Sequence, residues 1–389
     1  MHMRYERILL MLCIVLFGMP FFTLNAQTPL PEENWIRAVV WTMDGTKIAI
    51  ATEQGSIRIL STTGKIVRTL QNGPANSVVA LAWNPDGTKL ASGGSDPSIK
   101  IWDIASGNIL RTLKGHTFYV NSISWSPDGT KLVTTDRNDS PTSVRVWNPD
   151  TGQLLYAFTA GEAPIAAWNP NSKQFAIGQL QRIEIWDAAS GQSVKKIATP
   201  EYSFSIAWSP DGTKIASGDS YANTDSVIRI WDVNTGQLLQ TLTGHTNVIL
   251  SVAWSPNGTK IASSSHDHTV RIWDAVIGKS LSTIQTTDSV FQVAWSPYGG
   301  RLAYGEVATP NTATAAGLKL VVPPSTFQDL QVIEHRCVTG SEAQQALSPL
   351  LDSKRLSTFS AKVKSLSDKQ INPGCAADLA AVADSLQGK

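Results

Sequence analysis

Three adjacent side chains of types that bind metals and transfer protons stand out in the sequence: His266, Asp267 and His268. Imidazole and carboxylate groups are common zinc ligands and common general acids and bases. Neighbouring residues in a turn or strand point in alternating directions, however, so these three do not readily converge on one ion. The chain also carries no nucleophile motif and no phosphate-binding glycine loop. We therefore favour a structural role over the metal-site alternative, and expect no catalytic residue, no metal and no cofactor.

The segment that holds this cluster is one copy of a repeat. Seven tryptophans recur at intervals of about 40–46 residues: Trp41, Trp83, Trp125, Trp168, Trp208, Trp254 and Trp295. Each is followed by a turn sequence such as SPDGTK, and five units carry a second tryptophan: Trp102, Trp147, Trp186, Trp231 and Trp273. Twelve of the 13 tryptophans thus occupy one of two repeat positions. This regularity indicates a repeat architecture.

Each unit contains short β-branched runs bounded by turn residues, which is typical of antiparallel strands. In the sixth unit the expected strands are 248–255, 260–264, 269–273 and 279–284. Proline, aspartate and glycine in SPDG favour a tight hairpin turn. A four-stranded unit cannot bury both faces alone, so neighbouring units must stack, and a closed ring protects most strand edges. The sequence predicts an all-β fold, a seven-bladed β-propeller of four-stranded antiparallel blades.

The Gly-His pairs at 115–116 and 244–245 and the Trp-Asp pairs at 102–103, 186–187, 231–232 and 273–274 carry a family resemblance. With the unit length, they make residues 35–335 similar to WD-repeat propellers. The Gly-His pair is missing before five units, and the Trp-Asp pair is absent from the first and seventh, so those blades are expected to pack less regularly. In the family resembled, a terminal strand often completes the last sheet. We expect residues 327–334 to do so here.

The resemblance also implies a buried hydrogen-bonded chain of histidine, hydroxyl residue, aspartate and tryptophan. In the sixth unit its members would be His245, Ser263, Asp267 and Trp273. In the third unit they would be His116, Thr134 and Trp147, with either Asp136 or Asp139 as the carboxylate. Because the sixth unit alone keeps all four members in unambiguous register, we expect it to be the most rigid blade.

The connections at one end of the ring vary in length and composition, whereas those at the other end are uniform. Variable loops on a rigid scaffold are where recognition is usually built. The candidate partner-binding residues on these loops are Phe118, Tyr119, Arg137, Tyr202, Tyr221 and Asp225. Aromatic residues and arginine are typical interface anchors, although any one of these aromatics could instead only cover a blade end.

Residues 1–26 resemble a secretory signal peptide, with a basic start, a short apolar run and a small residue before Gln27. An uncleaved anchor is the weaker alternative, since the run is short for a membrane span. These features predict an exported bacterial type of propeller protein with an extracytoplasmic location, whether secreted, periplasmic or at the cell surface, and with no membrane contact after cleavage.

After the propeller, residues 336–389 show apolar residues at helical spacing over 341–351, 356–366 and 376–386. This pattern predicts a small helical appendage, with a loosely ordered tail as the alternative. Cys337 and Cys375 are the two cysteines outside the predicted signal peptide. They could form one disulfide or remain free thiols.

The formal charge is +1, with 32 basic and 31 acidic residues, which argues against nucleic acid as a partner. The sequence as a whole predicts a monomeric, non-enzymatic scaffold that binds a protein or peptide through the variable loop face. The alternative from another class is a propeller enzyme or small-ligand-binding propeller that acts at the central channel.

Overall fold

The computed structural model describes residues 35–73, 76–137, 143–161, 164–219, 226–306, 317–323, 325, 327–338, 343, 346–351, 356–366 and 371–387. The predicted signal peptide lies outside these residues, so it stays a prediction. Within the described ranges, no helix is both long enough and apolar enough to cross a membrane.

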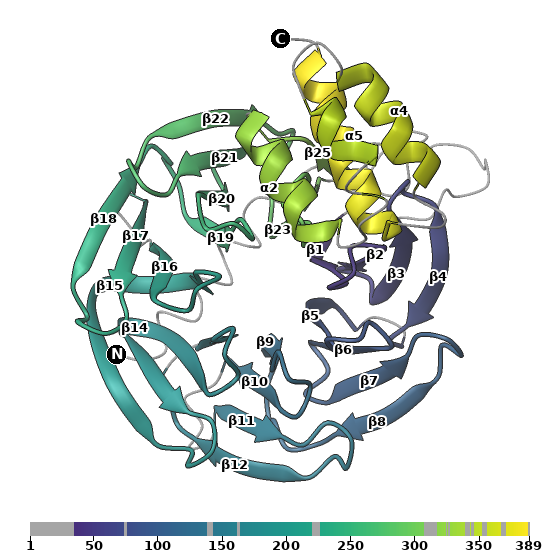
Figure 1. The fold of residues 1–389 in the computed structure, drawn as a ribbon. Coiled ribbons are helices and arrows are strands. Elements are labelled where there is room, and N and C mark those ends of the chain that lie inside the picture. The colour runs from purple at the N-terminus through teal and green to yellow at the C-terminus, as the bar shows by residue number, and fades with distance from the viewer. Residues whose placement is uncertain are drawn as a thin grey trace, which may run out of the picture. The chain divides into compact units, whose positions relative to one another are not determined.

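Short antiparallel strands account for nearly all of the repeat region and are arranged around a common centre (Figure 1). In the sixth unit they are β19 (Ile249–Trp254), β20 (Lys260–Ser265), β21 (Thr269–Asp274) and β22 (Ser280–Gln285), within one or two residues of the predicted bounds. The first three units have the same pattern. Their strands are β1 (Ile36–Trp41), β2 (Lys47–Thr52), β3 (Ser56–Ser61), β4 (Ile66–Gln71), β5 (Val78–Trp83), β6 (Lys89–Gly94), β7 (Ile99–Asp103), β8 (Ile109–Leu113), β9 (Val120–Trp125), β10 (Leu132–Asp136), β11 (Val144–Trp147) and β12 (Leu154–Phe158).

The strands of the described region pair into six hydrogen-bonded sheets, and not into the seven separate sheets that the repeats predict. The fourth and fifth units share one six-stranded sheet of β13 (Ile165–Trp168), β14 (Gln174–Asp187), β15 (Ser193–Trp208), β16 (Lys214–Asp219), β17 (Val227–Asp232) and β18 (Leu238–Thr243). They merge because β14 and β15 run on without a break. Within β14, Gln181 has a left-handed conformation with φ 58°. β15 runs without a break through Thr199, Pro200 and Glu201, so the last strand of the fourth unit and the first strand of the fifth are one strand.

The first strand of each unit packs against the first strand of the next, from β1 through β5, β9, β13, β15 and β19 to β23 (Val293–Trp295), which packs against β1 and closes the ring. Indole N–H groups also link successive units around the ring. Each of six first-strand tryptophans donates to a backbone carbonyl of the preceding unit at 2.9–3.2 Å: Trp41 to Ala294, Trp83 to Val40, Trp168 to Ser124, Trp208 to Ala167, Trp254 to Ala207 and Trp295 to Ala253. Apolar side chains form seven buried clusters between successive units.

The last sheet contains three described strands, β23, β24 (Leu302–Gly305) and β25 (Leu318–Val321). The prediction that residues 327–334 add a strand to it is wrong, because they belong to helix α2 (Phe327–Cys337). The helical period explains this outcome: Leu330 and Ile333 are spaced to share one buried face, and Asp329 lies in the first turn, where a negative charge stabilises the helix.

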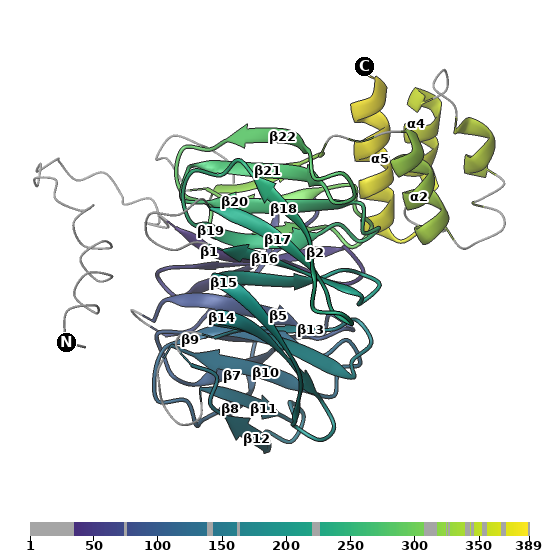
Figure 2. The same cartoon turned by 90° about the vertical axis from the view of Figure 1, so that its left-hand side faces the viewer.

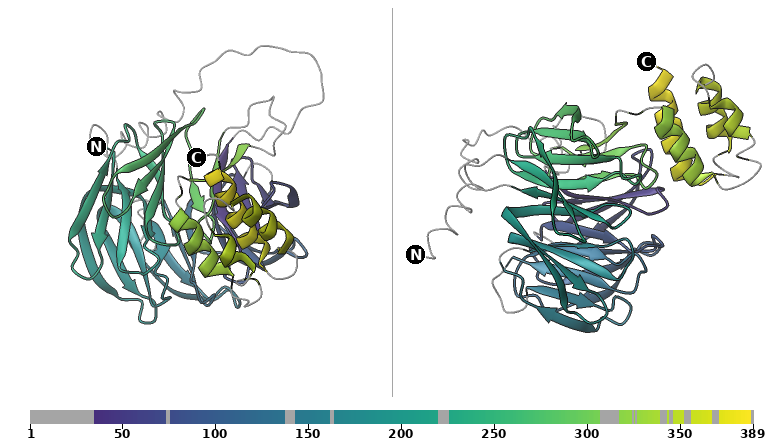
Figure 3. Two further views of the ribbon diagram at one scale, coloured as in Figure 1. Left: turned by 45° about the horizontal axis from the view of Figure 1, so that its top comes forward. Right: turned by 60° about the vertical axis from the view of Figure 1, so that its left-hand side comes forward.

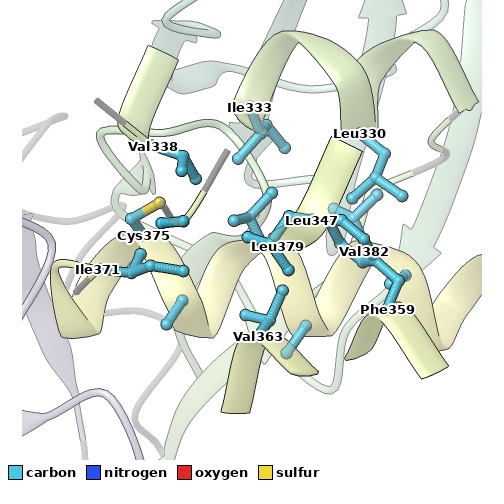
Figure 4. Packing of buried hydrophobic residues seen from close by; sticks show 14 of the residues in the cluster. Leu330, Ile333, Val338, Leu347, Phe359, Val363, Ile371, Cys375, Leu379 and Val382 are labelled. Atoms are coloured by element: carbon cyan, nitrogen blue, oxygen red, sulfur yellow. The ribbon is translucent and has the colours of Figure 1, made fainter. Parts of the chain in front are cut away.

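The chain ends in the small helical part that the sequence predicts. Besides α2 it contains the 3-10 helix η4 (Ser348–Leu350), α4 (Leu356–Leu366) and α5 (Pro373–Gln387). The predicted range 356–366 is confirmed, as is the helical character of 376–386. These elements share an apolar core of their own, which includes Leu330, Phe359, Val363 and Leu379 (Figure 4).

Cys375 lies in this core, fully buried and disulfide-bonded. The side chain of Cys337, at the end of α2, lies outside the described part of the chain. A bridge between the two cysteines therefore stays a prediction.

The helical part lies at the end of the ring that carries the uniform turns between first and second strands (Figures 2 and 3). The contact centres on Asp378 of α5, which is buried and accepts hydrogen bonds from the turn that joins β23 to β24. Ser296 Oγ donates to Asp378 Oδ2 at 2.5 Å, the Gly300 backbone N–H donates to Oδ2 at 3.1 Å, and Arg301 Nε donates to Oδ1 at 2.6 Å. A further ion pair joins Lys260 of β20 to Asp329 of α2 at 2.7 Å. One end of the ring is thus covered in part by the chain itself.

Candidate binding face

A pocket of about 290 Å³ opens at the other end of the ring, where the first strands begin. Its walls come from residues at or near the starts of the inner strands of all seven repeat units. The lining residues are Arg37, Val79, Ala80, Leu81, Tyr119, Asn121, Ser122, Ile123, Arg137, Ile165, Tyr202, Phe204, Ser205, Leu250, Ser251, Phe291 and Gln292. We call the end of the ring that carries this pocket the loop face. The pocket lies at the mouth of the central channel, where one ligand could contact several units at once.

Three of the predicted partner-binding residues meet at this pocket: Tyr119, Arg137 and Tyr202. Phe118 does not line it, but its side chain is 52% exposed on the same loop as Tyr119. Tyr221 and Asp225 lie outside the described residues, so their part in the face stays a prediction.

Sequence reasoning missed the pocket residues at or just before the first strands, above all Arg37, Phe204 and Phe291. The signal that locates them is the repeat. Residues four positions before the first-strand tryptophans include Arg37, Val79, Asn121, Phe204, Leu250 and Phe291, and all of these line the pocket. Because six of the seven units place this position at the pocket, aligning the repeats would have identified most of the inner ring of side chains.

The charged side chains that line the pocket are arginines, and both lie beside aromatic rings. The Arg37 guanidinium carbon lies 4.0 Å from the centre of the Phe291 ring, and that of Arg137 lies 6.0 Å from the Tyr119 ring. Both distances are in the range of cation–π contacts. Tyr202 and Phe204 meet edge to face with ring centres 4.5 Å apart. The pocket therefore combines positive charge with aromatic surface.

Arg37 has only part of its hydrogen-bonding capacity in use. Its Nη2 donates to Glu53 Oε1 at 2.9 Å, but the Glu53 side chain is 45% exposed, and such pairs contribute little. Its Nε is buried and has no hydrogen-bond partner within the described ranges. A guanidinium has five N–H donors, so Arg37 can bind a further acceptor.

The predicted network of the sixth unit lies behind this face, between the strands of the blade. His245 Nδ1 lies 2.7 Å from Asp267 Oδ2, and His245 Nε2 lies 2.7 Å from Ser263 Oγ. Trp273 Nε1 donates to the same hydroxyl oxygen at 2.8 Å. The structure thus brings all four predicted residues together, in an arrangement that satisfies buried polar atoms.

The third unit holds an equivalent set. His116 lies 2.7 Å from both Asp136 Oδ2 and Thr134 Oγ1, and Trp147 Nε1 donates to Thr134 Oγ1 at 2.8 Å. Asp136 therefore takes the place of the carboxylate, whereas Asp139 lies outside the described residues. The prediction that the sixth unit alone keeps all four members is wrong. The third unit supplies its carboxylate from a different position, since Asp136 lies two residues after Thr134 at the end of β10, whereas Asp267 lies four residues after Ser263.

Burial sets the protonation of both histidines. It lowers the pKa of His116 and of His245 below the usual histidine value, and the neighbouring aspartates offset this effect only in part. Both rings are therefore neutral at physiological pH. In the fifth unit, which has no such histidine, Arg229 Nη1 instead donates to Asp219 Oδ2 at 2.7 Å, and Trp231 donates to Ser217 Oγ at 3.0 Å.

His266 bonds a residue outside its own cluster. His266 Nδ1 lies 2.8 Å from Ser289 Oγ, and its ring meets Phe291 edge to face. His268 adopts a left-handed conformation with φ 60°. Within the ranges that the structure describes, no three histidine, cysteine, aspartate or glutamate side chains are grouped to hold a metal ion.

Comparison with known proteins agrees with this architecture. Residues 236–274 match the family described as WD domain, G-beta repeat. Residues 32–146 match Vps8 beta-propeller, and residues 116–246 match Eukaryotic translation initiation factor eIF2A. The four-stranded antiparallel sheets form a β-propeller, and residues 236–274 are similar to a WD40 repeat.

Relatives with partial sequence similarity are known from eukaryotes. Periodic tryptophan protein 2 homolog of Dictyostelium discoideum is 29% identical over 166 residues, which cover 40% of this chain and 18% of that protein. Ribosome biogenesis protein YTM1 of Meyerozyma guilliermondii is 30% identical over 132 residues, or 34% of this chain and 29% of that protein. Cell division cycle 20.1, cofactor of APC complex, of Arabidopsis thaliana is 27% identical over 175 residues, or 41% and 37%. The chain thus spans well under half the length of these relatives.

These relatives contradict the predicted extracytoplasmic location. Ribosome biogenesis, which gives one of them its name, takes place inside the cell. Their eukaryotic sources likewise do not support an exported bacterial type. The error arose because the location was inferred from 26 residues at one end of the sequence. None of the three names denotes an enzyme.

Proposed function

We propose that this propeller is a non-enzymatic scaffold that binds a protein partner through its loop face. The observation that carries the proposal is the pocket at the channel mouth, in which Tyr119 and Tyr202 from two different units converge with Phe204 and Phe291. Clustered aromatics with arginine are typical of binding hot spots. The helical part contacts the opposite end of the ring, at the turn between β23 and β24 and at Lys260 of β20.

The alternative function is catalysis or small-ligand binding in the channel. Such chemistry needs inward carboxylates or histidines that can move protons or hold a metal. The charged side chains that line the pocket are Arg37 and Arg137, with polar Asn121 and Gln292 beside them. This set suits the binding of a partner better than bond cleavage.

We also propose that the ring counts as seven units and acts as a monomer. The shared sheet of the fourth and fifth units contains two first strands, ending at Trp168 and Trp208, and each makes the indole bond to the preceding unit. The seven apolar clusters support the same count. With the ring closed on itself, no strand of a second copy is required.

Affinity capture with the purified chain tests the proposed face. We expect a specific partner to be lost when Tyr119 and Tyr202 are both replaced by alanine, and to be kept by Tyr156→Ala, whose hydroxyl bonds Ala188 O on the outer part of the ring. Folding of each variant is checked by its thermal midpoint. Equal capture by the intact chain and the double variant would refute the proposal.

A further inference from the structure

The charge of the pocket specifies the kind of partner. Arg37 and Arg137 line it from different units, and no carboxylate side chain is among its lining residues. The chain as a whole is close to neutral, with 32 basic and 31 acidic residues, so the positive character belongs to this site and not to a general basic surface. An arginine binds a carboxylate through two parallel N–H···O bonds, which gives both strength and orientation.

The aromatic rings specify the rest of the ligand. Phe291 lies against Arg37, while Tyr119 lies against Arg137. A carboxylate that reaches either guanidinium must therefore bring its neighbouring groups onto an aromatic surface. Apolar neighbours gain from this burial, at about 25 cal/mol for each Å² removed from water. The pocket volume of about 290 Å³ holds a few side chains and not a folded domain.

Resting on the function proposed above, we propose that the pocket binds an extended acidic peptide segment of a partner. Its aspartate or glutamate carboxylates pair with Arg37 and Arg137, and its apolar residues pack on Phe204 and Phe291. Glu53 shows that Arg37 accepts such a partner, because it makes the same carboxylate–guanidinium pair from an exposed position. A ligand carboxylate binds Arg37 either beside Glu53 or in its place.

A single-stranded nucleic acid would also offer negative charge and planar groups. Its recognition relies on a groove in which many lysines and arginines follow the backbone. Here the charged lining of the pocket consists of two arginines, and most of the remaining wall is aliphatic or aromatic. The observations therefore favour a peptide, and an oligonucleotide serves as a competing probe in the test.

The test is selection from a randomised nonapeptide library on the full chain at low salt, with binding of the selected peptide then measured by fluorescence anisotropy. We expect enrichment of aspartate and glutamate with apolar neighbours. Binding should weaken at least tenfold in Arg37→Gln and in Arg137→Gln, and should fall as salt is raised. Arg111→Gln is the matched control, because Arg111 is an exposed arginine of β8 that bonds backbone carbonyls at the outer edge. Its affinity should equal that of the wild type.

Four results would overturn the inference: enrichment of neutral or basic peptides, no enrichment, unchanged affinity in both arginine variants, or stronger binding of a single-stranded oligonucleotide to the same site. The tyrosine variants separate these failures from failure of the proposed function. If the Tyr119 and Tyr202 changes abolish peptide binding while the arginine changes do not, the face binds partners but not through acidic groups. If neither pair of changes matters, the loop face itself is wrong.

Discussion

Two turns at the same end of the ring are built from similar sequences and closed in different ways. In the fifth unit, Ser209 Oγ donates to Asp211 at 2.5 Å and the Thr213 N–H donates to the same carboxylate at 3.0 Å, so the turn closes on itself. In the seventh unit, Tyr298 stands where the aspartate would be. There the serine and the backbone N–H make the same two bonds to Asp378, at 2.5 and 3.1 Å. A distant helix thus supplies a group that the other turns carry themselves.

The residues after Tyr298 make room for Asp378 and bind it. Gly300 takes the place of the threonine, and a side chain there would collide with α5, since its Cβ would lie 2.7 Å from Asp378 Cβ. Arg301, in the seventh unit, contacts both the helical part and the first unit. It pairs with Asp378 of α5, donates to Thr62 O of the first unit at 3.2 Å and lies 4.9 Å from the ring of Trp41 in the same unit. Because the ring also closes here, through the bond from Trp41 to Ala294, the helical part holds the junction of the first and last units together.

Asp378→Ala should therefore produce the largest loss of stability. It leaves Arg301 and Ser296 buried without their acceptor, and breaking a buried ion pair in this way costs about 3–5 kcal/mol. Asp211→Ala is the matched control: it removes the same two bonds from a more exposed turn and should cost only about 1 kcal/mol. Urea unfolding of both variants measures the difference. Equal losses would show that the two turns are closed equivalently.

The disulfide should have the next largest effect. We propose Cys337 as the partner of Cys375, which would tie the end of α2 to α5 across a loop of the helical part. Closing a loop of this length contributes about 2–4 kcal/mol. Mass spectrometry of non-reduced peptides should find the cross-linked pair, and Cys375→Ser should lower the unfolding free energy as much as a reducing agent lowers that of the wild type. If the reducing agent leaves the unfolding curve of the wild type unchanged, the bridge does not hold the helical part.

The contrast between the two turns also explains how far the sequence could predict the structure. Strands and turns of the regular units follow from bonds between residues two to five positions apart, such as Ser209 to Asp211, so the repeat pattern contains them. The networks at His116 and His245 span about 20 residues within one unit and could be placed from the repeat. Asp378 could not, because its partners lie in another element some 80 residues away, although the missing aspartate in SPYGGR marks the turn that needs it.

The other differences have equally local causes. The segment 327–334 alternates too weakly to distinguish a strand from a helix, and its placement depends on the apolar core around Leu330 and Ile333. The shared sheet of the fourth and fifth units arises because β15 continues through residues 199–201, where the sequence predicts a loop between the two units. The pocket residue Arg37 was overlooked because strand residues were assigned to structure and loops to function, and Phe291 was overlooked because it lies just before a first strand and not in one of the variable loops considered.

A smaller loss of stability is expected from changes in the hydrogen-bonded network of the sixth unit, whose members all lie in or beside that unit. Ser263→Ala leaves His245 and Trp273 without their shared hydroxyl, and His245→Ala leaves Asp267 and Ser263 without the imidazole. Each change should lower the unfolding free energy by about 1–3 kcal/mol because buried polar groups lose their partners. Thr283→Ala on the exposed face of β22 is the control and should change little. A melting temperature equal to that of the wild type in both network variants would show that the network does not stabilise the blade.

The smallest expected effect is the pH dependence of the same networks. Because burial lowers the pKa of His116 and His245 in the folded protein, the unfolded chain binds protons more readily as the pH falls below about 6.5. Each histidine therefore contributes stability that is present above that pH and is lost on acidification, by up to about 1.4 kcal/mol per pH unit. Asp378 acts in the opposite direction, since burial raises its pKa above the usual aspartate value, although Arg301 beside it favours the ionised form. The contribution of each histidine is measured by urea unfolding between pH 7.5 and 5.5. The pH dependence of the unfolding free energy of the wild type is compared with that of His116→Asn and of His245→Asn. The slope of the unfolding free energy against pH should decrease in each variant. An unchanged slope in both would mean that neither network contains a histidine that must stay neutral in the folded protein.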